Sequence, residues 1–239
     1  MHKKMKIICL FTLLGVSLPL FARVAEEPYD YRERTRQLAF DPARFFTERN
    51  GLDLFISVRY TGDDYGYPVY SIGVRKGCIF SDEGEARKSC GNRLVARMVR
   101  SPSGGKVERP RSRGQRLFGA LSGKKIADDA GLKNALNEYG LEWFEADLNA
   151  CAPAIMHLKT AGETKFFPTA PLPDNNAPFD IILHADKIEL LFGEYLGRVR
   201  YYGLPQKDNP GGWADDFAKS LESCWVPATA VVPWNVPNP

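Results

Sequence analysis

The chain has 239 residues, of which 44% are hydrophobic and 26% are charged, and its formal net charge is +3 at pH 7. This length suits one domain or two small ones, and the hydrophobic content excludes a chain too polar to form a core. The near-neutral total conceals a marked asymmetry: residues 87–125 hold twelve basic residues and one acid, whereas residues 126–239 hold eight basic and sixteen acidic residues.

Residues 1–22 have the pattern of a secretory signal peptide. Three lysines among the first six residues precede a short apolar run at 7–18, and Ala22 is a suitable cleavage residue. The apolar run is shorter than the roughly 18–20 residues that a membrane-spanning helix needs. We therefore expect a periplasmic or secreted protein that begins at Arg23, with an uncleaved anchor as the alternative.

Four of the five cysteines remain after removal of this segment, which contains Cys9. An even number in an exported chain favours disulfides, and of the three connectivities we expect Cys78–Cys90 and Cys151–Cys224. Each bond would stabilise the fold by about 3–4 kcal/mol. A zinc site is disfavoured because the chain has no C-x-x-C pair, and we expect neither a metal nor a cofactor.

Residues 23–120 are predicted to form a half that is rich in β-structure. A weak helical pattern at 32–40 is followed by Asp41-Pro42, which is typical of a helix start, and Phe45 and Phe46 would pack that short helix on the core. Apolar residues alternate along 52–60, and a turn-rich segment leads to a second apolar run at 69–80, so we expect a hairpin. Residues 92–100 fit a third strand or a short helix.

Residues 101–116 lose all periodicity and contain several prolines and glycines, so we expect an exposed loop that separates two halves, 23–120 and 121–225. Its basic side chains could bind a polyanion, because guanidinium groups pair well with phosphate and carboxylate. The alternative is a solvated loop that the acidic second half partly neutralises. The candidate binding residues are Arg109, Arg111, Arg113 and Arg116.

The second half is predicted to contain a helix at 125–140 that ends at Gly140, followed by a segment at 141–148 that fits either a strand or a helix. The buried candidates on the helix are Ile126, Ala130, Ala135, Leu136 and Tyr139. Another helix should begin after Cys151, with Pro153 in its first turn and its apolar side chains facing the core. Those side chains are Ile155, Met156 and Leu158.

An apolar run at 179–183 opens a region of two or three strands that extends to residue 203, with a turn expected near Asp186-Lys187. A final helix should start at Asn209 and pack one face on the sheet, since Trp213, Phe217 and Leu221 recur at helical spacing. The tail, 226–239, has too many prolines for a helix or a central strand, so we expect an extended surface strip or a mobile segment.

Catalytic signals are weak throughout the chain. Only two histidines remain after the signal peptide, His157 and His184, and Asp186 would share a strand face with His184. A site can be drawn from these three residues, but a strand-end histidine and a turn aspartate explain the same pattern. Residues 122–125 match S-x-x-K without its partner motifs, and no nucleotide-binding loop is present. We therefore predict no catalytic residue.

These observations predict an α+β fold in which antiparallel hairpins or a sheet pack against helices, held by two disulfides. The leading functional hypothesis is an exported, non-enzymatic binding protein of the cell envelope that engages another protein, for instance as an inhibitor or immunity protein against an envelope-acting toxin. One alternative is binding of an anionic envelope polymer or lipid head group through the arginines at 109–116. Another is a periplasmic hydrolase of unrecognised type. Nucleic acid is not an expected partner of an exported, disulfide-bonded chain.

Overall fold

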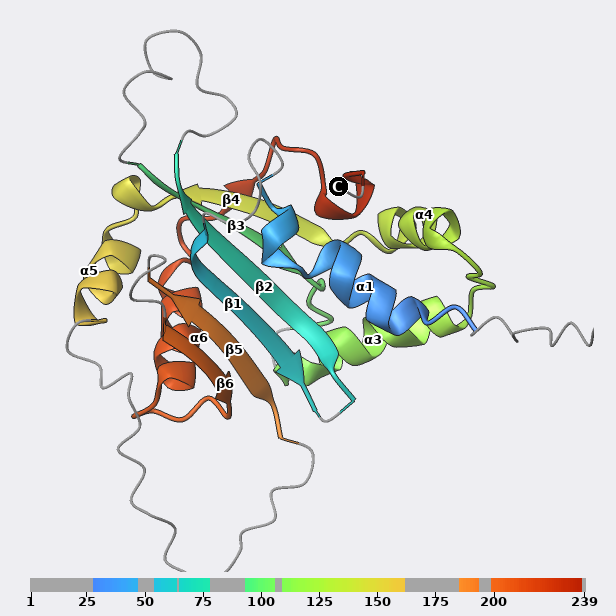
Figure 1. Cartoon of the computed structure of the whole chain (residues 1–239), viewed down its shortest axis with the longest axis horizontal. Coiled ribbons are helices and arrows are strands. Elements are labelled where there is room, and N and C mark those ends of the chain that lie inside the picture. Colours follow the sequence, from blue (N-terminus) through green and yellow to red (C-terminus); the bar gives the residue numbers. More distant parts are fainter. Residues whose placement is uncertain are drawn as a thin grey trace, which may run out of the picture.

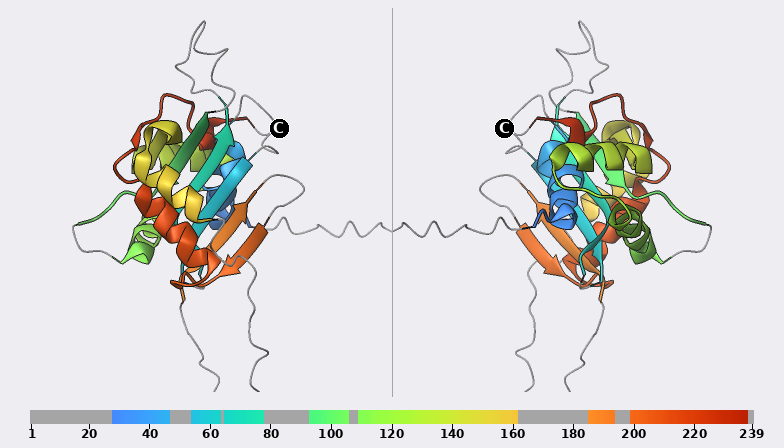
Figure 2. Two further views of the ribbon diagram at one scale, coloured as in Figure 1. Left: turned by 90° about the vertical axis from the view of Figure 1, so that its left-hand side faces the viewer. Right: turned by 90° about the vertical axis from the view of Figure 1, so that its right-hand side faces the viewer.

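One antiparallel sheet of seven strands organises the described part of the chain, with helices on both of its faces, as Figures 1 and 2 show. The computed structural model describes residues 28–46, 54–63, 65–77, 93–105, 109–161, 185–193 and 199–237. The strand order is β6-β5-β1-β2-β3-β4-β7, so strands from both predicted halves share one sheet. The α+β class is confirmed. The strands are β1 (Leu54–Gly62), β2 (Tyr67–Lys76), β3 (Leu94–Arg100), β4 (Glu142–Asp147), β5 (Lys187–Phe192), β6 (Val199–Gly203) and β7 (Val226–Pro227).

The helices divide into two layers. On one face lie α5 (Ala152–Thr160), its preceding 3-10 turn η4 (Leu148–Ala150), and α6 (Pro210–Ser220). The other face carries α1 (Tyr31–Ala39), η1 (Pro42–Arg44), α3 (Pro110–Ser122), α4 (Asp129–Tyr139) and η5 (Pro233–Asn235).

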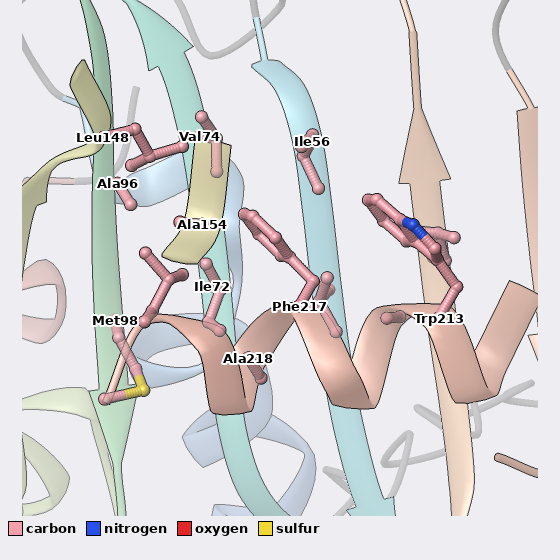
Figure 3. Close-up of a cluster of buried hydrophobic side chains, with 14 of the residues drawn as sticks. Ile56, Ile72, Val74, Ala96, Met98, Leu148, Ala154, Trp213, Phe217 and Ala218 are labelled. Carbon is pink, nitrogen blue, oxygen red and sulfur yellow. The ribbon is translucent and has the colours of Figure 1, made fainter. Parts of the chain in front are cut away.

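The core beneath α5 and α6 is almost entirely apolar (Figure 3). Asn209 caps α6 by accepting a hydrogen bond from the Gly212 amide. Pro210 occupies the first turn, where backbone N–H groups have no partner within the helix, so its missing N–H costs no hydrogen bond. Trp213, Phe217 and Leu221 then face the strands and are buried, so the predicted helix and its packing face are confirmed. Each such side chain contributes about 1.5–3 kcal/mol through removal from water.

The disulfide between Cys151 and Cys224 closes this layer. It links the start of α5 to the segment after α6, with the two Cα atoms 5.8 Å apart and 73 residues between them in sequence. This predicted bond is confirmed. Cys78 and Cys90 lie outside the described residues, so the second bond stays a prediction.

The opposite core is formed by α1, α3, α4 and the C-terminal tail. Phe45 and Phe46 are buried after η1, where the Asp41 carboxylate accepts from the Ala43 amide, as the Asp-Pro pattern predicted. The tail contains β7 and the 3-10 turn η5, and it is more than a surface strip because Trp234 is 2% exposed. Hydrogen bonds fix it: the Trp234 indole donates to Asn137 Oδ1 at 2.6 Å, and the Trp143 indole donates to the Ala230 carbonyl at 3.0 Å.

Two charged side chains are buried inside this second core. Arg97 on β3 is 1% exposed and Glu145 on β4 is 5% exposed, and Arg97 Nε lies 3.5 Å from Glu145 Oε2. Arg97 also donates to the Phe45 carbonyl at 2.7 Å. Two guanidinium groups lie over the Phe46 ring, that of Arg97 at 4.9 Å and that of Arg75 at 4.7 Å from the ring centroid. Ion pairing, a hydrogen bond and cation–π contacts together offset the cost of removing this charge from water.

Strand β1 alternates as the sequence predicts, but its pairing with β2 has two irregularities, and the first of them changes the face of one side chain. Ile56, Val58 and Tyr60 face α6, but the register with β2 shifts between Leu54 and Ile56. The extra residue turns Leu54 toward the opposite core, where it contacts Gly73.

The largest error of the sequence analysis concerns residues 101–116, because the expected loop becomes helix α3 at Pro110. Its apolar face consists of Leu117, Phe118 and Leu121. Gly114, one of the glycines that suggested a loop, instead allows close packing of α3 on the β1–β2 hairpin, and Gly62 does the same from the hairpin side. A Cβ atom at Gly114 would lie 2.6 Å from the Pro68 carbonyl oxygen, and one at Gly62 would lie 2.2 Å from Arg111 Cβ.

Smaller corrections concern single residues. Ala130 and Met156, both expected in the core, are exposed, whereas Ala135 and Leu136 are buried as expected. The ambiguous segment at 141–148 contains strand β4. Lys187 is the first residue of β5 and not part of a turn. Gly140 ends α4 in the left-handed conformation, with φ at 74°, as predicted. The apolar run at 179–183 lies outside the described residues.

Candidate functional site

The arginines predicted to bind a partner lie at the start of α3, where structural contacts hold several of them. Arg109 is exposed and precedes the helix, Arg111 packs on Gly62, and Arg116 donates to the Pro102 carbonyl at 2.7 Å. Arg113 is half-buried, and its pKa is lowered by burial and by the like charge of Arg100. This group therefore combines exposed cations with side chains that contact the β1–β2 hairpin and the segment after β3.

His157 and Asp186, the two described residues of the catalytic site considered from the sequence, have separate structural roles. The His157 ring stacks on the Trp213 ring with centroids 5.1 Å apart, and its Nε2 lies 3.0 Å from the Trp213 carbonyl oxygen. Asp186 instead accepts from the Tyr60 hydroxyl at 2.9 Å and from the Asp63 amide at 3.1 Å. His184 lies outside the described residues. His157 thus anchors α5 to α6, and Asp186 fixes the end of the β1–β2 hairpin.

Tyr60, which is buried, and Tyr70, which is partly buried, extend this hydrogen-bonded region on the α6 side of the sheet. The rings of Tyr60 and Tyr70 are 5.2 Å apart, and the Tyr70 hydroxyl donates to Asp215 at 3.3 Å. Burial and the nearby carboxylates raise the pKa of both phenols, so they remain neutral donors over the physiological range. Asp215 is in turn paired with Lys219 at 2.7 Å. These contacts fasten α6 to the sheet.

The most distinctive surface lies on the other face, where the helical layer ends before the sheet does. In Figure 1, β1, β5 and β6 face the viewer while α1, α3 and α4 lie to one side. Within the described ranges, no helix packs over β5 and β6 on this face. The boundary between the covered and uncovered strands forms a groove of about 300 Å³. We call it the open groove; its lining comprises Glu33, Arg36, Gln37, Phe40, Asp41, Arg59, Tyr60, Thr61, Gly66, Pro68, Ser71, Glu189 and Tyr202.

The floor of the open groove is a row of directly paired residues on four strands. Ser71 on β2 is opposite Arg59 on β1, Arg59 is opposite Glu189 on β5, and Glu189 is opposite Tyr202 on β6. Side chains opposite one another in an antiparallel sheet project from the same face. Strand register therefore brings together residues up to 143 positions apart, from 59 to 202.

The charges of the open groove are paired with one another. The Arg59 guanidinium contacts the Asp41 carboxylate and lies 3.6 Å from Glu189, which is also 3.2 Å from Arg200. In the wall formed by α1, Arg36 pairs with Glu33 at 2.9 Å. Each acidic side chain of the lining thus has a cationic partner, an arrangement that stiffens the surface and displays both signs of charge.

Aromatic side chains lie at both ends of this surface. Tyr202 is 65% exposed on β6, and Tyr65 is 60% exposed in the hairpin turn next to the lining residue Gly66. Arg36 donates to the Gly66 carbonyl at 3.1 Å and so holds the turn against α1. Exposed tyrosine and arginine on a rigid framework are enriched in protein-binding surfaces.

Sequence reasoning identified the alternating strand at 52–60, which contains Arg59, but did not identify the groove. Alternation showed that Arg59 points away from the apolar face. Its alignment with Glu189 and Tyr202 depends on the pairing of β5 with β1 and β6, which no local pattern specifies.

Comparison of the chain with protein-family models, with curated proteins and with solved structures found no match. Among the described residues, no cluster of histidine, cysteine and acidic side chains could hold a metal ion. A membrane-crossing helix was also sought in this part of the chain, and none is sufficiently long and apolar.

Proposed function

We propose that the chain is an exported binding protein of the cell envelope that recognises another protein through the open groove. The observation that carries the proposal is the incomplete helical layer, which leaves a rigid, mixed-charge surface on β1, β5 and β6 with Tyr65 and Tyr202 beside it. Export rests on the signal-like segment at 1–22 and on the disulfide, since such bonds persist in oxidising compartments.

A protein fits this surface better than a polyanion does. The lining contains three acidic and two basic side chains, so it offers no uniform positive field to attract phosphate or sulfate groups. Paired charges of both signs select a partner by complementary placement, and like charges in a wrong partner oppose binding. A proteinaceous inhibitor or immunity factor against an envelope-acting toxin is one protein of this kind.

The test is affinity capture from an envelope extract with matched variants as bait. Gln37 is exposed and lines the open groove from α1, so Gln37→Trp should fill part of it without changing the core. Arg32→Trp adds the same bulk at an exposed position of α1 outside the lining. A third bait, Arg109→Ser/Arg116→Ser, tests the basic start of α3.

We expect one envelope protein to be retained by the wild type and by Arg32→Trp and to bind Gln37→Trp at least about tenfold more weakly. Equal retention by all baits would refute the groove. Selective loss with the Arg109→Ser/Arg116→Ser bait, together with a steep decrease in binding with salt, would favour an anionic envelope component instead. Sequencing of the exported protein should find Arg23 at its N-terminus.

A further inference from the structure

The two edges of the sheet differ in their ability to accept another strand. β7 at one edge has two residues, and one of them, Pro227, has no N–H to donate. β6 at the other edge has five residues, Val-Arg-Tyr-Tyr-Gly, and no proline. Among the described residues, β6 pairs only with β5. Natural proteins protect sheet edges with short strands and prolines, and β7 is protected in this way whereas β6 is not.

The register shows which backbone groups of β6 point outward. The Gly193 amide donates to the Phe55 carbonyl at 2.9 Å, next to the β1–β5 ladder. Hydrogen-bonded pairs alternate along antiparallel strands, so Gly193 and every second residue before it direct their backbone groups to β1. Leu190 falls between these residues and directs its backbone N–H and C=O groups to β6, where it is paired with Tyr201. Arg200 and Tyr202, the neighbours of Tyr201, therefore direct their N–H and C=O groups away from the sheet.

From this edge we infer that β6 binds β6 of a second copy of the chain in antiparallel orientation, with Tyr201 on the two-fold axis. In this register, Arg200 of each copy faces Tyr202 of the other, and four backbone hydrogen bonds form. Both side chains are available, because the Arg200 side chain is 75% exposed and Tyr202 is 65% exposed. Each guanidinium would lie over a tyrosine ring, an attractive cation–π pair that occurs twice by symmetry.

The neighbouring registers are poorer. A slip that centres Arg200 on the axis places two like charges opposite each other. A slip that centres Tyr202 instead places Arg200 opposite Leu204, beyond the end of the strand. Only the register centred on Tyr201 uses both outward-facing residues of both copies and pairs each cation with an aromatic ring.

Pairing in this register continues the floor of the open groove across the axis. The row Arg59, Glu189, Tyr202 would gain Arg200 of the second copy as its next member. Two open grooves would then lie on one continuous sheet face and could engage a symmetric partner.

The test is sedimentation equilibrium of the purified chain, produced with its own N-terminal segment, up to the concentrations used for NMR. Tyr202→Pro removes an outward N–H without breaking the β5–β6 ladder, so it should abolish association. Tyr202→Lys places a lysine opposite Arg200 of the second copy and should weaken the dimer roughly tenfold. Adding Arg200→Glu to Tyr202→Lys restores an opposite-charge pair and should recover association.

Recovery by the double variant is the decisive result, because a general loss of folding cannot produce it. A wild-type chain that remains monomeric at the highest concentration overturns the inference, as does a dimer that Tyr202→Lys leaves unchanged. Gln37→Trp lies on α1 and should leave the dimer intact, so a loss of groove binding in this variant can be separated from a loss of the dimer.

Discussion

The two faces of the sheet are built on different principles. The face beneath α5 and α6 buries Ile56, Ile72, Val74 and Phe217 in a continuous apolar cluster, and a disulfide fixes its helices. The other face buries Arg97 and Glu145 with its aromatic rings, and its helical layer ends at β1. The first face therefore acts as the scaffold, whereas the second carries the buried charge and the open groove that we propose as the binding surface.

The largest effect should come from breaking the scaffold face. Cys151→Ala/Cys224→Ala opens a loop with a sequence separation of 73 residues and should lower the free energy of unfolding by about 4 kcal/mol. Urea denaturation measures this loss. Mutation is preferable to a reductant, which would also act on any bond between Cys78 and Cys90.

Met156→Ala, on the exposed side of α5, is the control and should change stability by less than about 0.5 kcal/mol. An unchanged unfolding midpoint in the double alanine variant would show that packing alone holds this layer.

The buried pair of the second face offers a sharper comparison. Glu145→Gln leaves Arg97 in the core without its carboxylate and should cost about 3 kcal/mol. Arg97→Met/Glu145→Leu removes both charges, so it should recover most of that loss in a double-mutant cycle by urea denaturation. Glu138→Gln breaks an exposed pair with Lys124 and should cost well under 1 kcal/mol. If the double variant is as unstable as Glu145→Gln, the pair supplies more than charge compensation.

The scaffold face was largely predictable from the sequence because its signals are local. Trp213, Phe217 and Leu221 recur at helical spacing, the Asn-Pro pair starts α6, and the apolar alternation of 52–60 indicates a strand. The disulfide between Cys151 and Cys224 was predicted because it joins the two ends of the unit that contains these elements.

The second face was harder to predict because its residues are placed by partners distant in sequence. Arg97 looks like a surface cation on a strand, and only the cover of Phe45 and Phe46 makes it buried. Gly114 suggested a loop because a glycine needed for close packing and one needed for a turn look the same in a single sequence. The open groove combines both difficulties, since it depends on strand register and on where a layer of helices ends.

The smallest predicted effect concerns the rim of the second face, where Asp129 at the start of α4 accepts from Arg34 and from the Tyr29 hydroxyl. The hydrogen bond from Arg34 is the main cause of the lowered pKa of Asp129. A lowered pKa stabilises the fold above the unfolded-state value of about 4, and this stabilisation is lost as the pH falls through the folded-state pKa.

Because the pair is about one-third exposed, Asp129→Asn should cost only about 1 kcal/mol at neutral pH. The difference in unfolding free energy between the two proteins should vanish in acid and shrink with added salt. Asp216→Asn, at an exposed site on α6, should cost less at neutral pH. An Asp129→Asn difference that stays constant with pH would mean that packing, and not charge, joins α1 to α4.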